Sequence, residues 1–251
     1  SLDDKLYGYM YDEALKAKKS VFDWAKDQTT LRVEGLGIKS LKGLDAWMPK
    51  LKNLYVNDNE LTELDLTGFH EMKSVYANNN KISSLSVSSE NKIYWLEVNG
   101  NSLVSLPVSD MPQLSHLKCS NNNIDVLYLN DNAKLNYLDC SSNYLTELVL
   151  DKTTELNTLI CSYNQFVKSD FVLPANANFN TFKAVNCFID VDELNLQNST
   201  ALRYIDVSNN KSLQNLRLPA SVPNLKELVA NDCNLRKVFC GGNNFHLFDH
   251  D

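Results

Sequence analysis

The chain has 251 residues, with 24 Lys and Arg against 31 Asp and Glu, and a formal net charge of −7. This acidic balance argues against a nucleic acid as partner, because phosphate binding requires clustered Lys and Arg side chains. No apolar run in the sequence is long enough to cross a membrane, so no membrane span is expected.

Residues 1–28 carry a helical pattern. Asp3 and Asp4 near its start and Lys18 and Lys19 near its end suit the dipole of a helix. An amphipathic membrane helix is the alternative, and the mixed rather than basic charges argue against it. Apolar side chains recur at intervals of three and four residues, as on one face of a helix, at Leu6, Met10, Ala14, Ala17, Val21, Trp24 and Ala25.

From residue 29 onward the chain repeats. The segment that begins at Leu114 superposes residue for residue on the segment that begins at Leu135, an offset of 21. The period lengthens to about 23 in the coils after Leu156. A fixed period of this length is typical of a solenoid. We therefore predict a solenoid domain over residues 29–251, about ten coils of 21–23 residues, with residues 1–28 as an N-terminal helical cap.

Positions are counted from the first leucine of each coil, such as Leu114, and each position has a predicted role. The segment around position six alternates apolar and polar residues, which predicts short strands that stack in parallel about 4.8 Å apart. The inward sixth position reads Val56, Ala77, Val98, Cys119, Cys140, Cys161, Ala184, Val207 and Ala230. The ninth position reads Asn59, Asn80, Asn101, Asn122, Asn143, Asn164, Cys187, Asn210 and Cys233. We expect its amides to bond backbone groups beyond the strand, and to bond one another between coils.

The second half of each coil carries a further apolar pair, such as Leu64 with Leu66 or Leu106 with Val108. Turn formers follow directly, as at Thr67, and they leave too few residues for helical turns. We therefore predict a second short extended segment on the convex side of the coil. The first coil, residues 29–50, is degenerate and has Leu36 in the asparagine position.

The repeat pattern L-x-x-L-x-C-x-x-N-x-L is that of the leucine-rich repeat. Its 21-residue period, with a cysteine ladder at Cys119, Cys140 and Cys161, resembles the bacterial internalin type. The chain departs from that type because only these three of nine sixth positions are Cys. The fold expected is an α/β-type leucine-rich-repeat solenoid of short parallel strands and turns with few helices. The resemblance also implies a bacterial protein of the cell surface or secreted, which binds ligands of a host or neighbouring cell.

The six cysteines all occupy core positions of the repeat, including Cys187, Cys233 and Cys240. Cysteines in neighbouring parallel coils point the same way at about 4.8 Å, outside the usual disulfide geometry. We expect buried free thiols that behave as small hydrophobes. No C-x-x-C motif occurs, so neither a metal nor another cofactor is expected.

Positions three, five, seven and eight are predicted to face solvent on the strand side. Trp95, His116 and Tyr137 share position three in consecutive coils, so we expect them side by side. Aromatic rings with a few charges resemble an interface hot spot or a sugar-stacking platform; the alternative is that they stack only for stability. The candidate ligand-binding residues are Tyr55, Tyr76, Trp95, Glu97, His116, Lys118, Tyr137 and Asp139.

The function expected is non-catalytic binding of a protein or glycan ligand by a monomer outside the cytoplasm. A hydrolase is the first alternative, with His116 as base and Ser120 or Ser141 as the nearest hydroxyl. An open solenoid surface argues against it, because catalysis usually requires an enclosed cleft. A structural or display module of a larger surface protein is the second alternative.

Overall fold

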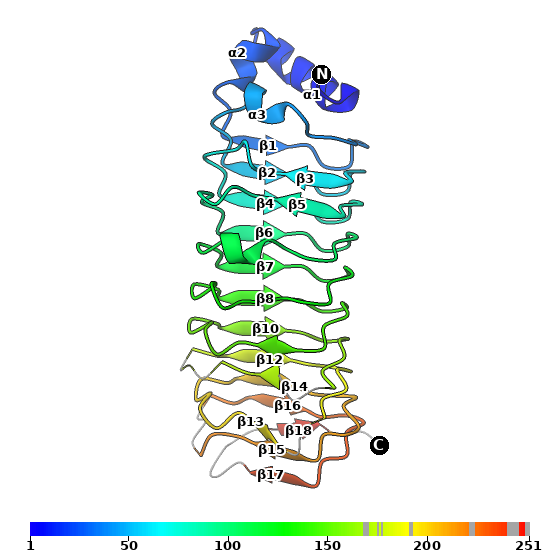
Figure 1. Ribbon diagram of the computed structural model, residues 1–251, viewed down its shortest axis with the longest axis vertical. Helices are drawn as coiled ribbons and strands as arrows, with labels where there is room; N and C mark the ends of the chain where they lie inside the picture. Colours follow the sequence, from blue (N-terminus) through cyan, green and yellow to red (C-terminus); the bar gives the residue numbers. More distant parts are fainter. Residues whose placement is uncertain are drawn as a thin grey trace. The chain divides into compact units, whose positions relative to one another are not determined.

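The computed structural model divides the chain into two compact units, each described by itself: unit 1 is Ser1–Asn123 and unit 2 is Ile124–Asp251. In both units short parallel strands stack coil upon coil, as in a β-solenoid (Figure 1). The structure describes residues 1–167, 171–174, 176, 178–190, 193–220, 224–239 and 246–248.

The strands of unit 1 confirm the predicted register. Leu54 pairs with Val75 and Leu96 pairs with Leu117, one coil apart, and all four side chains are buried. In order, the paired strands are β1 (Thr30–Arg32), β2 (Asn53–Tyr55), β4 (Ser74–Tyr76), β6 (Trp95–Glu97) and β7 (His116–Lys118). In the second half of the coils, β3 (Glu63–Asp65) pairs with β5 (Ser84–Ser86).

Unit 2 repeats this arrangement. Its strand side comprises β8 (Tyr137–Asp139), β10 (Thr158–Ile160), β12 (Thr181–Lys183), β14 (Tyr204–Asp206), β16 (Glu227–Val229) and β18 (His246–Phe248). Its other side carries β9 (Leu148–Val149) paired with β11 (Phe171–Val172), and the row β13 (Leu194–Asn195), β15 (Asn215–Arg217) and β17 (Lys237–Phe239).

The second extended segment is confirmed in the coils that carry these strands, but no strand forms at the predicted pair Leu127 and Leu129, nor in the coil with Leu106 and Val108. There a 3-10 helix, η1 (Val108–Asp110), begins directly after Pro107. Proline has no N–H to donate to a ladder, so a turn replaces the strand in this coil.

The N-terminal region of unit 1 is helical, as predicted, but it consists of two helices rather than one run. They are α1 (Asp4–Lys16) and α2 (Val21–Ala25), and Lys18 between them has a φ of 58°. Leu6, Met10 and Ala14 are buried, whereas Ala17 is exposed because α1 ends before it. A short α3 (Leu44–Trp47) follows in the first coil.

The ninth-position asparagines bind the coils together. The Oδ1 of Asn122 accepts from the backbone N–H of Leu103 in the preceding coil at 3.0 Å. Its Nδ2 donates to the carbonyls of Val98 and Cys119, at 3.0 and 3.1 Å. One amide thus satisfies backbone groups of two coils, as expected. In the degenerate first coil, Leu36 takes the asparagine position and is 38% exposed.

The amide side chains at position seven also join neighbouring coils, by accepting from the backbone of the next coil. The Oδ1 of Asn57 accepts from the backbone N–H of Asn78, whose own Oδ1 accepts from Asn99, both at 2.8 Å. The eighth residue of each coil then turns the chain with positive φ, as at Asn79 (56°) and Gly100 (66°). Asn and Gly tolerate this conformation, which explains the polar composition of the turn.

Four cysteines confirm the prediction of buried free thiols: Cys119, Cys140, Cys161 and Cys187. Cys233 forms no disulfide but is only partly buried, so the expectation that every cysteine lies inside is wrong. Cys240 lies outside the described residues.

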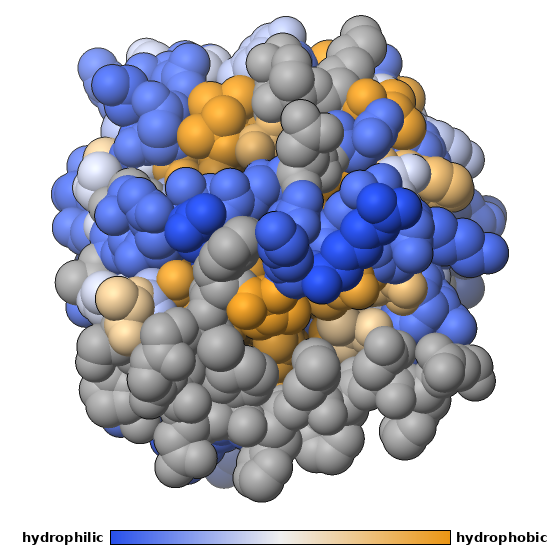
Figure 2. All heavy atoms as spheres, turned by 90° about the horizontal axis from the view of Figure 1, so that it is seen from below, coloured by the Kyte–Doolittle hydropathy of each residue, from blue (hydrophilic) through white to orange (hydrophobic). Residues whose placement is uncertain are grey.

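The partial exposure of Cys233 is shared by other core positions of its coil. Leu235 and Val238 are also partly exposed, whereas their counterparts in earlier coils, such as Leu61 and Leu64, are buried. A core side chain of a solenoid is buried by the coils on both sides of it, so it depends on both neighbours. Figure 2 views the molecule from the side where β17 lies and shows hydrophobic patches on either side of a hydrophilic band.

None of the helices in the described part of the chain could span a membrane.

We predict that Asn164→Ala lowers the free energy of unfolding by about 2–4 kcal/mol, because buried backbone groups lose their partners. Asn164 accepts from Leu145 N–H at 3.0 Å and donates to the carbonyls of Cys140 and Cys161 at 3.1 Å. Urea unfolding measures the change. Asn234→Ala, at an exposed position of the same unit, is the control and should cost less than about 0.5 kcal/mol. Equal losses in the two variants would contradict this role of the ninth position.

We also predict that a maleimide added to the native protein modifies Cys233 before the four buried cysteines, because only an accessible thiolate reacts. Peptide mapping by mass spectrometry identifies the labelled sites. Modification of Cys119 or Cys140 at the rate of Cys233 would contradict the burial of the cysteine row.

Candidate functional site

A continuous stack of planar side chains lies on the strand side of unit 1. The Arg32 guanidinium carbon lies 3.8 Å from the centre of the Tyr55 ring. The rings of Tyr55 and Tyr76 stack at 4.4 Å and 7°, and Tyr76 is tilted by 38° against Trp95 at 6.2 Å. Trp95 and His116 stack at 3.5 Å and 4°. We name Arg32, Tyr55, Tyr76, Trp95 and His116 the aromatic ladder.

The parallel register produces this ladder. Paired residues of neighbouring parallel strands point to the same side about 4.8 Å apart, which is close to the stacking distance of rings. Tyr55 pairs with Tyr76, and Trp95 pairs with His116. Between these two pairs the ladder changes from position five to position three, and the Tyr76–Trp95 contact is accordingly wider and tilted.

Glu97 lies beside the ladder and connects its members. Its carboxylate accepts a hydrogen bond from the Trp95 indole N–H at 2.8 Å and one from the Asn78 amide at 3.3 Å. The His116 Nε2 lies 3.6 Å from its Oε2. Burial, then the neighbouring Tyr55 and Glu97, raise the pKa of Tyr76 to about 12. These contacts fix the rotamers of Trp95 and Glu97, so the surface is preorganised.

His116 is buried, with 9% of its surface exposed, and the prediction that it faces solvent is wrong. The register predicts only the side of the sheet, whereas the stacked Trp95 ring decides how much of the imidazole is covered. Burial lowers the pKa of His116 to about 4; Glu97 opposes this shift and Lys118 adds to it. The imidazole is therefore neutral at pH 7.

Six of the eight predicted binding residues belong to unit 1, and two belong to unit 2. Tyr55, Tyr76, Trp95, Glu97 and Lys118 are partly exposed, in contrast to His116. Tyr137 and Asp139 lie on β8, where they pair with Thr158 and Ile160 of β10 and are partly exposed.

The Ser120 hydroxyl, one of the two candidate hydroxyls of the hydrolase alternative, and the nearby Asp139 carboxylate both make other contacts. Ser120 Oγ donates to the Asn99 Oδ1 at 2.8 Å. The Asp139 carboxylate accepts from the backbone N–H of Ser141 at 3.0 Å. Among the described residues, no group of three or more His, Cys, Asp or Glu is placed to hold a metal ion.

Arg32 and Asn78 belong to the site and were not predicted. Arg32 occupies position five of the degenerate first coil and pairs with Tyr55. The sequence signal for Arg32 is its place one coil before Tyr55 and Tyr76 in the same row. Nothing in the sequence indicates the bond from Asn78 to Glu97, because it depends on side-chain rotamers.

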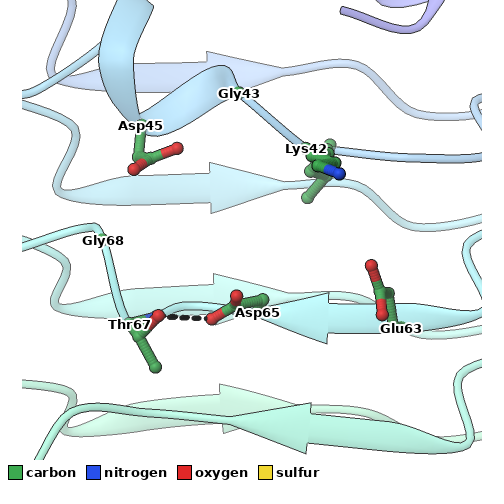
Figure 3. Close-up of a pocket in the computed structure, with 8 residues that line it drawn as sticks. Lys42, Gly43, Asp45, Glu63, Asp65, Thr67 and Gly68 are labelled. Atoms are coloured by element: carbon green, nitrogen blue, oxygen red, sulfur yellow. Dashed lines mark hydrogen bonds between the residues drawn. The ribbon is translucent and has the colours of Figure 1, made fainter.

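A separate pocket of unit 1 lies between the start of α3 and β3 (Figure 3). Glu63 and Asp65 come from β3, and Thr67 donates its hydroxyl to Asp65 at 2.6 Å. The Asp45 carboxylate lies against Gly68, where a Cβ atom would collide with it. Of the three carboxylates, that of Asp65 is held by the turn at Thr67.

Comparisons with known proteins support the fold. No protein-family model and no curated sequence matches the chain. The internalin InlF of Listeria monocytogenes is 18% identical over 98% of this chain and 91% of its own, with a TM-score of 0.63. Internalin C2 of the same species is 17% identical over 98% and 93%, with a TM-score of 0.58. YopM, a leucine-rich effector protein from Yersinia pestis, is 22% identical over 92% and 60%, with a TM-score of 0.65.

These similarities, with the strands described above, confirm the predicted leucine-rich-repeat solenoid and its likeness in fold to the internalins. At such identities the likeness concerns the fold, and function has to be argued from the site.

We predict that His116→Phe reduces the loss of stability on acidification. The folded pKa of about 4 lies below the unfolded value of about 6.5, so the unfolded state binds more protons between these values. Stability therefore rises with pH across this window and is lost as the pH falls through it. The wild type should lose about 3 kcal/mol more than His116→Phe between pH 7 and pH 4. Urea unfolding at each pH measures the difference, and parallel curves would contradict it.

Proposed function

We propose that the protein is a non-catalytic binding protein that holds a protein or glycan ligand on its strand side, outside the cytoplasm. The aromatic ladder is the observation that carries this proposal. The proposed contact residues in unit 1 are Tyr55, Tyr76, Trp95, Glu97 and Lys118. The buried His116 stacks on Trp95 and supports its position. Tyr137 and Asp139 of unit 2 are proposed from their repeat positions.

The composition of the ladder supports binding. Trp, Tyr and Arg are the residues most enriched among interface hot spots, and the ladder contains all three. Tyr55, Tyr76 and Trp95 are partly exposed, so they offer surface to a ligand. Their rotamers are already fixed by stacking, so a ligand would immobilise few side chains on binding.

The ladder also stabilises unit 1, so its two roles have to be separated. Aromatic pairs contribute about 0.5–1.5 kcal/mol each beyond their buried area. Loss of Trp95 removes its stacking on His116 and its hydrogen bond to Glu97 together. An alanine variant alone therefore reports on both binding and stability.

The variant Tyr55→Phe/Tyr76→Phe separates the two roles. It retains both stacked rings and removes both hydroxyls together. We expect its free energy of unfolding to stay within about 0.5 kcal/mol of wild type. Its affinity for the ligand should fall by about tenfold, because polar edge contacts are lost.

The ligand is identified by probing a glycan array and an array of recombinant extracellular protein domains with the labelled protein. On the ligand found, Trp95→Ala should weaken binding by about 30-fold or more, the magnitude of a hot spot. Tyr128→Ser is the control, because Tyr128 is 64% exposed and lies in the second half of its coil. Binding that survives both ladder variants would show that the rings stack for stability only.

A further inference from the structure

Two buried thiols of unit 2 contact each other across neighbouring coils. Cys161 directly follows β10, and Cys187 follows β12, the strand paired with β10, after a short turn (Figure 1). Both residues are 0% exposed. The Cys187 thiol donates to the carbonyl oxygen of Cys161 at 3.1 Å, and the Cys161 thiol is hydrogen-bonded to the Cys187 sulfur. The two sulfur atoms are therefore neighbours, as a disulfide requires.

The inward row of cysteines has a different geometry. Cys119, Cys140 and Cys161 share position six in successive coils. Equivalent side chains of parallel strands point the same way with Cβ atoms about 4.8 Å apart, whereas a disulfide requires about 3.5–4.5 Å. Cys187 comes from position nine, and its bond to the Cys161 carbonyl shows that it points back to the preceding coil. A disulfide is thus favoured between Cys161 and Cys187 rather than along the row.

Hydrogen bonding between coils does not explain a thiol at position nine. The amide of Asn164 accepts one backbone hydrogen bond and donates two. Cys187 has a single hydrogen, which it shares between the carbonyls of Cys161 and Val185 at 3.1 and 3.5 Å. A thiol is also a weaker donor than an amide. A covalent bond to Cys161 would join the same two coils more firmly than this hydrogen bond does.

A later coil provides an internal comparison. Cys233 also occupies position nine, and its Sγ lies 3.0 Å from the carbonyl oxygen of Val207 in the preceding coil. The separation along the sequence, 26 residues, is the same as that between Cys161 and Cys187. Position six of that preceding coil is valine, so the same backbone geometry cannot give a disulfide there. A cysteine at both positions is therefore needed.

The two thiols differ in their acidity, and this difference sets the order of reaction. The hydrogen bond from Cys161 lowers the pKa of Cys187, whereas burial raises the pKa of Cys161. Because the thiolate is the nucleophile, Cys187 reacts first and Cys161 supplies the second sulfur. Neither residue is exposed, so a protein cannot reach them and the oxidant has to be small.

We propose that Cys161 and Cys187 form a reversible disulfide on reaction with hydrogen peroxide. The Cys187 thiolate attacks one peroxide oxygen, and the O–O bond breaks to give a sulfenic acid and hydroxide, which takes up the proton lost by Cys187. The Cys161 sulfur then attacks the Cys187 sulfur, the S–O bond breaks, and the hydroxyl leaves as water with the Cys161 proton. Two electrons pass from the thiols to the peroxide. This proposal is independent of the proposed function, because neither cysteine belongs to the proposed contact residues.

Treatment of the reduced, native protein with hydrogen peroxide tests the proposal. Remaining thiols are then blocked with N-ethylmaleimide in denaturant, and peptides are mapped by mass spectrometry without reduction. The peptide of Cys161 should be linked to that of Cys187, and dithiothreitol should separate them. The oxidised wild type should melt about 5 °C above the reduced protein, because the cross-link constrains the unfolded chain.

Two variants distinguish this pair from general oxidation. Cys187→Asn restores the asparagine of the repeat, so it should lose the cross-link and the redox-dependent shift while its reduced form melts no lower than reduced wild type. Cys140→Ala is the matched control and should keep the cross-link, because alanine occupies position six elsewhere, as at Ala184.

Three results would overturn the proposal. One is a disulfide between Cys140 and Cys161 in place of the proposed one. Another is oxidation of Cys233 while Cys161 and Cys187 stay thiols. The third is conversion of Cys187 to a sulfinic acid without a cross-link, since a neighbouring thiol should capture the sulfenic acid first.

Discussion

The amide of the ninth-position asparagine is the interaction on which the coils of both units depend. A parallel strand of three residues leaves most backbone groups of its coil without a ladder partner, and buried backbone groups have to be bonded. Asn122 satisfies groups of its own coil and of the preceding coil at once, and Asn164 does the same in unit 2. Where Cys187 replaces it, the thiol donates to the carbonyl of Cys161 at 3.1 Å, which is a weaker bond.

The aromatic ladder follows from the register that these amides hold. Because equivalent residues of successive coils lie at one fixed spacing, planar side chains in one row stack on each other with little adjustment. The same stacking buries His116 and keeps it neutral at pH 7, and it directs the Trp95 indole N–H toward Glu97. A surface that is assembled coil by coil in this way is rigid before any ligand arrives, which lowers the entropic cost of binding.

The predictions that were wrong concern residues whose environment depends on the end of an element or on a neighbouring side chain. Ala17 fits the apolar spacing of a helix, but α1 ends before it. Cys233 occupies a core position, but it is only partly buried. Val108 fits an extended pair, but Pro107 removes the N–H that a strand requires. The binding role of all eight predicted residues, Tyr137 and Asp139 of unit 2 included, stays a prediction.

The sequence by itself determined the period, the inward rows and the polar turns, because these depend on residue type at fixed intervals, and a repeated pattern reinforces each such inference. Only the tertiary structure decided that Trp95 and His116 stack face to face, that Glu97 links them, and that the Cys187 thiol contacts Cys161. These features depend on side-chain rotamers and on contacts between neighbouring coils, whose residues lie about twenty positions apart in the sequence. A linear pattern specifies which side of a strand or helix a residue occupies, but not which neighbour covers it.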